Sequence, residues 1–419
     1  MRRSPERVAW LVLSLALLSC CALTVGVPAG TWALVNAVTV EPKIEVRLRA
    51  GILKAFSRYE QENDARVVSL DGRPLEEGAT VIVGPESVGL MTVGALSEQG
   101  SPMFTIQLYA NAHVHIERAR LPRFSFASRS NELHLRLLRG RIQIQVEDSQ
   151  PRLFEVWVVT PDGKLVVSSP GAYSVEKAAT ETRVAVAAGS ATVFTADGGR
   201  AIRLSAGQRT IARAPSQLAG VLPPVRNLVR NSAFQTALKP DWQVETLVMQ
   251  GSTVTGTATI RNEEGRTALF LERVGSGIGW GRTGVTQILN EDVLERQSLQ
   301  LRVDFRILYQ EIPVCGGEGS ECPLMVRIDY RTRDGRDAYW IQGFYALGTP
   351  TATTLPDYIR ANPQNKHIAR RLNTVEPPFE SENLLAILPD MQLLKSITLY
   401  AEGHAVRTRI NSVELLLQE

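Results

Sequence analysis

The sequence lacks the short motifs that mark common enzyme classes. It has no Gly-x-Ser-x-Gly nucleophile elbow, no His-Glu-x-x-His helix and no glycine-rich phosphate loop ending in Lys. Two of its five histidines, His113 and His115, share a strand face by their spacing, but the sequence indicates no third metal ligand beside them. The two carboxylates that hydrolyse glycosides can be far apart in the sequence and meet only in the folded protein. A hydrolase therefore remains a hypothesis, ranked third after the two given at the end of this subsection. We expect a protein that is not an enzyme and has no cofactor.

Charged residues are absent between Val8 and Val40, and the seven residues before this run hold three arginines against one glutamate. About 20 apolar residues span the hydrocarbon core of a bilayer as a helix, and the stretch from Val8 to Val27 supplies them. Basic residues stay on the cytoplasmic side of a membrane. We therefore predict a cytoplasmic tail at 1–7, a transmembrane anchor with an interfacial extension at 8–40, and a single-pass cell-membrane protein whose bulk is extracytoplasmic.

Two alternatives remain for this segment. Gly26, Pro28 and Gly30 interrupt the helical pattern, which resumes at Trp32, so the run is either a spanning helix with an extension or a long signal peptide. A secretory signal usually has an apolar core of about 7–15 residues, which is shorter than this run. The residues up to Cys20 also resemble a lipoprotein box, although free cysteine often serves as a small apolar residue in a helix. We favour the retained helix.

Cysteine is scarce beyond this segment, where only Cys315 and Cys322 occur. Disulfides persist outside the cytoplasm, so we predict that these two residues form a disulfide that closes a short loop. Two thiols with no His or further Cys nearby do not supply the four ligands of a structural zinc site, and no metal is expected. Glu318 and Glu321 in the loop offer oxygen ligands for calcium, but solvated loop charge is the favoured interpretation.

The sequence also lacks a basic stripe. Its 46 basic and 43 acidic residues alternate in sign along the chain, whereas nucleic-acid-binding proteins concentrate positive charge on one face. No nucleic-acid partner is expected.

The length of 419 residues favours two outer domains, because a single core seldom grows beyond about 250 residues. A proline-containing stretch without alternation, at 215–226, separates two regions that differ in residue pattern. We predict domains at 43–214 and 227–419, joined by this linker.

The first domain shows strict alternation, as in Leu133, Leu135 and Leu137, with glycine-containing turns at short intervals. Period-two patterning of this kind predicts strands with one buried face. The order of its motifs resembles the FecR-type extracytoplasmic domain: Arg139-Gly140, Val159-Thr160-Pro161-Asp162-Gly163, Ser169-Pro170-Gly171-Ala172-Tyr173-Ser174-Val175 and Leu204-Ser205-Ala206-Gly207-Gln208. Its upstream half also matches the opening of the family, so a repeated β module is expected.

The FecR resemblance implies signalling across the envelope. Members of that family that regulate iron uptake read an outer-membrane receptor and control a sigma factor through a cytoplasmic segment. The predicted inner tail here ends near Arg7, so signalling would pass through a partner membrane protein.

The second domain opens with Asn227-Leu228-Val229-Arg230-Asn231 and continues to Asp241-Trp242, which resembles the start of galactose-binding-like jelly rolls. The strands that follow are adequate for a two-sheet sandwich. An Asp-Gly pair within 333–336 predicts a hairpin with a type I′ turn.

The jelly-roll resemblance implies sugar binding through loop aromatics. Trp280, in the glycine-rich segment 277–282, is the best candidate together with Arg282, because an exposed Trp is unusual without a partner. The alternative is that Trp280 covers one end of the core. Four aromatics on one strand are expected in the core or in cross-strand pairs, and the core is favoured for all of them: Tyr339, Trp340, Phe344 and Tyr345.

Together these observations predict an all-β ectodomain, a FecR-like β domain plus a galactose-binding-like (carbohydrate-binding-like) β-sandwich, on one transmembrane helix. We expect a non-catalytic binding or structural protein of the cell envelope whose ligand is a cell-wall or surface glycan. The alternative is an envelope signalling component, related to FecR-type sigma-factor regulators, that acts through an envelope protein partner.

Overall fold

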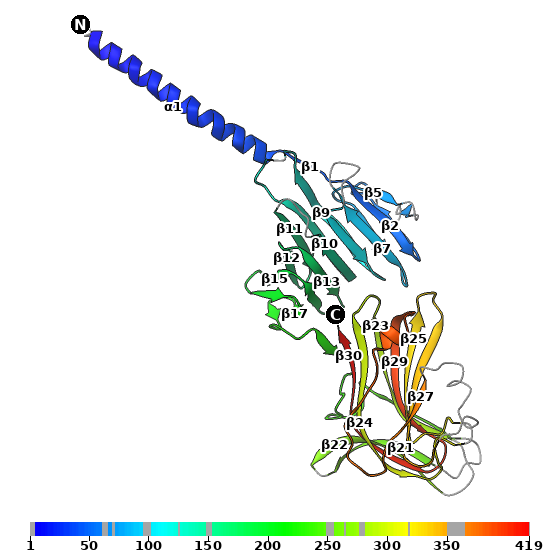
Figure 1. Ribbon diagram of the computed structural model, residues 1–419. Helices are drawn as coiled ribbons and strands as arrows, with labels where there is room; N and C mark the ends of the chain where they lie inside the picture. The colour runs from blue at the N-terminus through cyan, green and yellow to red at the C-terminus, as the bar shows by residue number, and fades with distance from the viewer. Residues whose placement is uncertain are drawn as a thin grey trace. The chain divides into compact units, whose positions relative to one another are not determined.

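The computed structural model describes residues 5–60, 66–68, 72–94, 102–124, 126–147, 153–248, 255–263, 265–275, 281–316, 319–349 and 365–418. The chain divides into two compact units, Met1–Pro223 and Pro224–Glu419, each with its own hydrophobic core. Apart from the helices α1 and α3, the regular structure in the described ranges is β-strand (Figure 1). The prediction of a chain that is nearly all β is confirmed.

The helix α1 spans Pro5–Ala37 without a break. The predicted interruption near Pro28 is therefore wrong. Hydroxyl groups on both sides of the proline bond to carbonyls four residues earlier, from Thr24 to Cys20 at 2.8 Å and from Thr31 to Val27 at 2.7 Å. No helix in the described part of the chain combines the length and the apolar character that a membrane crossing requires. The spanning role predicted for Val8 to Val27 is thus not supported by the structure.

The strands of the first unit are mostly short and antiparallel. Their bounds are β1 Thr39–Val40, β2 Ile44–Ala50, β3 Leu53–Phe56, β4 Arg66–Val67, β5 Arg73–Leu75, β6 Thr80–Val83, β7 Val88–Val93, β8 Phe104–Leu108, β9 His113–Pro122, β10 Asn131–Val146, β11 Phe154–Thr160, β12 Gly163–Val167, β13 Gly171–Lys177, β14 Thr182–Ala188, β15 Ser190–Thr195, β16 Ala201–Ser205, β17 Gln208–Arg213 and β18 Gln217–Leu218.

Two sheets of the first unit share the long strand β10. One sheet has the order β5-β2-β7-β8-β10-β13-β14-β17-β18, and the other β4-β3-β6-β9-β10-β11-β12-β15-β16. Residues 132–139 of β10 pair with β9, and residues 140–146 pair with β13. The two sets meet at Gly140, whose φ is +79° and whose Cβ position would lie 2.5 Å from the Cα atom of Ala112. Only glycine fits this crossing point, because a side chain would meet both strain and backbone there.

A buried ion pair lies in the turn that follows β11. The Nζ atom of Lys177 is 2.9 Å from Oδ2 of Asp162, and the two side chains are only 8% and 6% exposed. The hydroxyl of Thr182 also donates to Asp162 at 2.9 Å. This turn belongs to the segment Val159 to Gly163 that carries the FecR resemblance, and its acid ties β13 and β14 to the turn.

The second unit contains twelve strands and one short helix in its described residues. Their bounds are β19 Val225–Asn227, β20 Gln243–Val248, β21 Thr255–Glu263, β22 Arg266–Val274, β23 Gly281–Asp292, β24 Ser298–Gln310, β25 Leu324–Thr332, β26 Asp337–Tyr345, β27 Lys366–Ala369, β28 Phe379–Glu380, α3 Leu384–Ile387, β29 Met391–Glu402 and β30 Val406–Gln418.

These strands form a two-sheet sandwich. One sheet has the order β21-β22-β30-β24-β28, with β19 also paired to β30, and the other β20-β23-β29-β25-β26-β27. Alternate residues such as Leu301, Val326 and Leu399 are fully buried between them, as the period of two requires. The hairpin between β25 and β26 forms where predicted, but only Gly335 has a positive φ, of +81°. The predicted type I′ turn is wrong, since that type needs two consecutive residues with positive φ.

Candidate functional site

The second sheet of the sandwich carries an outward polar face that centres on a tyrosine. Tyr339 on β26 is 40% exposed, and the guanidinium of Arg327 lies 4.5 Å from its ring centroid. Asp329 accepts a hydrogen bond from Arg327 at 2.7 Å and one from Ser396 at 3.3 Å. Strand pairing sets Asp329 opposite both Tyr339 and Ser396. We call these four residues, with Thr398 on β29, the tyrosine face.

The tyrosine face combines an exposed aromatic ring with fixed hydrogen-bonding groups. Thr398 continues it toward β23, where its hydroxyl lies 2.9 Å from the hydroxyl of Thr286. Every one of these side chains stands on a strand, and sheet pairing fixes the spacing between strands. An aromatic ring flanked by donors and acceptors on a rigid element suits a ligand that is apolar on one side and polar at its edges.

Of the two ligand-binding candidates predicted from the sequence, Arg282 lies within the described residues and Trp280 does not. Arg282 lies on the outer side of β23, where it bonds to Glu402 at 2.9 Å and covers the ring of Tyr400 at 4.4 Å. Burial raises the pKa of Tyr400 to about 12, so its hydroxyl stays protonated at neutral pH. Arg282 therefore helps to hold its own sheet together. Trp280 lies outside the described residues.

Tyr339 was assigned to the core from the sequence, and this prediction is wrong. Its neighbours Trp340 and Phe344 are buried at 2% and 0% exposure in the main core. The period of two puts Tyr339 on the opposite face from both. Alternation within the run of aromatics was the signal that could have separated them.

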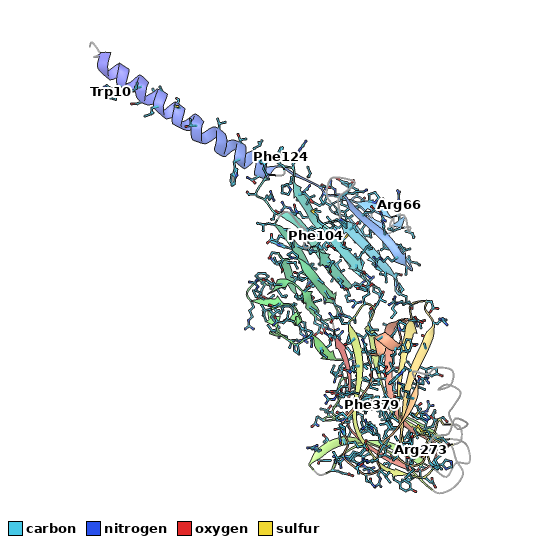
Figure 2. The ribbon with its side chains drawn as sticks, viewed as in Figure 1. Trp10, Arg66, Phe104, Phe124, Arg273 and Phe379 are labelled. Atoms are coloured by element: carbon cyan, nitrogen blue, oxygen red, sulfur yellow. A yellow bond between two sulfur atoms is a disulfide. The ribbon has the colours of Figure 1, made fainter. Side chains whose placement is uncertain are left out.

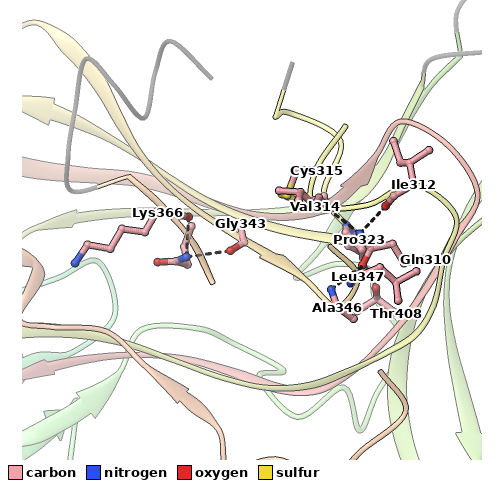
Figure 3. Close-up of a disulfide and its surroundings, with 12 residues drawn as sticks. Gln310, Ile312, Val314, Cys315, Pro323, Gly343, Ala346, Leu347, Lys366 and Thr408 are labelled. Carbon is pink, nitrogen blue, oxygen red and sulfur yellow. Dashed lines mark hydrogen bonds between the residues drawn. A yellow bond between two sulfur atoms is a disulfide. The ribbon is translucent and has the colours of Figure 1, made fainter. Parts of the chain in front are cut away.

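The disulfide between Cys315 and Cys322 forms as predicted (Figure 3). Both cysteines are buried in a small cluster outside the main core, with Met325, Tyr345 and Tyr400 among its members. Gln310 fixes the loop from two sides, because its amide donates to the carbonyls of Ile312 and Val314 at 2.7 Å and accepts from the backbone N–H of Ala346 at 2.6 Å. These bonds and the disulfide together fix the loop against the sheet.

A histidine that the sequence analysis did not expect lies beside this disulfide. Parallel pairing of β27 with β26 places His367 opposite Gly343, and a ring nitrogen of His367 lies within 4.8 Å of both sulfur atoms. The premise that no histidine is near the two cysteines is therefore wrong. Sulfur atoms joined in a disulfide are not thiolate ligands, so His367 is the one metal-binding donor of this group. Burial lowers the pKa of the His367 imidazole to about 4.

Two pockets occur near β27 in the described part of the second unit. The larger, of about 560 Å³, is lined by Arg370, Arg371 and Glu376 among others. Arg370 and Glu376 pair across it at 3.0 Å. The smaller, of about 170 Å³, lies between Trp340 and Phe379, and falls below the roughly 300–1,000 Å³ of typical small-molecule sites. Neither pocket presents a set of convergent, unshared polar groups.

Comparison with known proteins gives only distant structural likeness. No protein-family model and no curated protein matches the sequence. The structure is similar to a putative anti-sigma factor from Parabacteroides distasonis, with 14% identity over 34% of this chain and 59% of that one, at a TM-score of 0.24. It is also similar to a family 11 carbohydrate-binding module of Clostridium thermocellum (13% identity, 44% and 91% coverage, TM-score 0.24) and to the CBM22-1 xylan-binding domain of Paenibacillus barcinonensis (12%, 46% and 96%, 0.24).

Likeness at this level identifies no family. The chain spans 59% of the anti-sigma factor that it resembles.

Proposed function

We propose that the second unit is a non-catalytic glycan-binding module and that the tyrosine face is its binding surface. The observation that carries the proposal is the 40% exposure of Tyr339 on a strand, next to Arg327, Asp329 and Thr398. The apolar face of a pyranose ring stacks on an aromatic side chain, while its hydroxyls bond to charged and hydroxyl groups at the edge. Because strands hold these groups in place, binding costs little ordering entropy.

We propose further that the β units act outside the cytoplasm and that α1 attaches the protein to the cell membrane. The disulfide between Cys315 and Cys322 supports the compartment, since disulfides persist where the environment is oxidising. The attachment draws on the absence of charge between Val8 and Val40, not on the structure. Protease treatment of intact cells tests the location: digestion of the bulk of the chain is expected, and full protection contradicts the proposal.

Glycan binding is tested with the full-length chain and the variant Tyr339→Ala. A glycan array identifies a ligand, and calorimetric titration then measures its affinity. Loss of one stacking ring is expected to cost about 1.5 kcal/mol, or roughly tenfold in Kd. The matched control is Tyr309→Ala, because Tyr309 is 50% exposed on β24 of the other sheet. Its affinity should equal that of the wild type.

Three results count against the proposal. An array without any bound glycan, or an equal loss of affinity in both variants, removes the tyrosine face as a glycan site. Release of shortened sugars from a bound glycan shows catalysis and favours a hydrolase. Recovery of one specific membrane protein from membranes, without glycan binding, favours the signalling alternative.

A further inference from the structure

One end of the sandwich holds a buried arginine that the glycan-binding proposal does not use. Arg273 lies on β22, where Leu269 and Leu271 point into the core, and the period of two turns Arg273 to the same side. Its side chain is among the largest fully buried ones, at 1% exposure. Figure 2 labels its position in the second unit. Its Nε atom donates to the carbonyl of Gly403 at 2.9 Å. No sequence motif marks Arg273, but its place in the alternation of β22 already indicates the inner side of the strand.

The outer nitrogens of Arg273 are left without acceptors among the residues that the structure describes, because neither Nη1 nor Nη2 meets a hydrogen-bond partner there. The hydroxyl of Thr283 on β23 is likewise unpartnered, and Thr283 is 0% exposed. An arginine stays charged and carries five N–H donors. A buried charge with unmet donors is costly for a folded protein, so these two side chains suit an acceptor from outside the chain.

Two glycines allow these groups to lie directly against the backbone of the neighbouring strands. A Cβ atom at Gly256 on β21 would overlap the Thr283 hydroxyl and lie 3.2 Å from Nη1 of Arg273. A Cβ atom at Gly281 would lie 2.8 Å from Nη1 and 2.7 Å from Nη2. Neither glycine has a positive φ, so space and not backbone conformation requires them. The Thr283 hydroxyl and Nη1 of Arg273 therefore lie close to the same point, so a single acceptor bound there would be near both groups.

The nearby carboxylates do not neutralise Arg273. Glu402 and Glu321 attract its charge without contacting it, and burial outweighs this attraction, so the pKa of Arg273 stays below its ordinary value. Glu402 is bonded to Arg282 at 2.9 Å instead. An additional negative charge would compensate the cost of burying the guanidinium.

We propose that Arg273 and Thr283 form an oxyanion-binding site in the second unit. Nη1 and Nη2 would donate to the oxygens of a carboxylate or sulfate group, and the Thr283 hydroxyl would add a third bond. The planar fork of an arginine matches such groups in two-point contact. The anion is either free in solution or carried on a sugar. The site lies on residues other than the tyrosine face, so its test does not depend on glycan binding there.

The experiment is thermal unfolding of the full-length chain by calorimetry in acetate, sulfate, glucuronate or glucose, with chloride at equal ionic strength as the reference. At ten times its Kd, a ligand of the folded state should raise the Tm of the second unit by about 3–6 °C. Sulfate also stabilises proteins without a specific site. The variant Arg273→Met separates specific binding from this general stabilisation. In chloride its Tm should be no lower than that of the wild type, and its Tm should not rise with the anions that bind the site.

The matched control is Arg266→Met, an exposed arginine on the same strand, which should keep the full response. Thr283→Val should respond more weakly than the wild type, and it serves as the second variant if Arg273→Met does not fold. An equal response of Arg273→Met and the wild type, or no shift beyond chloride in any anion, overturns the site. A Tm shift with glucuronate but not with acetate indicates that the anion is carried on a sugar. An equal Tm shift with acetate indicates that the anion is free in solution. Either result supports the site.

Discussion

The buried pair of Asp162 and Lys177 offers the sharpest test of what holds the first unit together. The change Asp162→Asn removes the negative charge and leaves Lys177 in a site where only 8% of its side chain is exposed. Removing one partner of a buried pair costs about 3–5 kcal/mol. We expect the lower end, about 3 kcal/mol, because Nζ of Lys177 still donates to the carbonyls of Ala178 and Ala179 at 2.5 and 3.2 Å.

Urea unfolding measures this cost as a shift of the transition of the first unit, by about 1 M toward lower urea. Adding Lys177→Met to Asp162→Asn should restore stability to within about 1 kcal/mol of the wild type, because no unpaired charge is then left. The matched control is Glu117→Gln, which breaks the exposed pair with Arg136 and should cost less than about 1 kcal/mol. Equal costs for the two single changes, or a double variant no more stable than Asp162→Asn, would refute the reasoning.

Two further predictions concern the disulfide cluster. The imidazole of His367 has a pKa of about 4 in the folded protein, against an ordinary value of 6.5. On acidification the unfolded chain therefore takes up the proton before the folded one does. The free energy of unfolding of the second unit should fall by about 2 kcal/mol between pH 7 and pH 5. His367→Gln should remove this part of the pH dependence, and an unchanged profile would contradict it. The double change Cys315→Ala with Cys322→Ala opens a loop of sequence separation 7, which should cost about 2 kcal/mol in urea unfolding. Full stability of that variant would show that hydrogen bonds, including those of Gln310, hold the loop without the disulfide.

Much of the β architecture could be predicted from alternation. The residues Leu133, Leu135 and Leu137 are fully buried, because a strand with one covered face leaves no other arrangement for its apolar side chains. The sharing of β10 by two sheets could not be predicted, since strand pairing depends on contacts between distant parts of the chain. The helix through Pro28 was also missed, because a proline removes only one backbone hydrogen bond of the helix, the one to the carbonyl of Thr24, and the helix continues past it.

The candidate sites were harder to predict than the fold. The position of Arg282 on the second sheet gives it Glu402 and Tyr400 as partners, and those contacts follow only from the pairing of β23 with β29. The nearness of His367 to the disulfide depends on a parallel strand pair across about twenty residues of chain. For Tyr339 and Arg273, by contrast, the side of the strand on which each lies is already set by the parity of its position. Rules based on residue type place aromatics in cores and arginines on surfaces, and they give the wrong side of the strand for both residues.

The sharing of β10 has a consequence for how the first unit loses its structure. Because one uninterrupted strand supplies hydrogen bonds to β8, β9, β11 and β13, pulling it out removes the central partner of both layers at once. The two sheets of the unit cannot come apart as independent pieces, because both depend on this strand. Cutting the chain next to this strand would leave two incomplete fragments, each with an open edge ready to pair with another molecule.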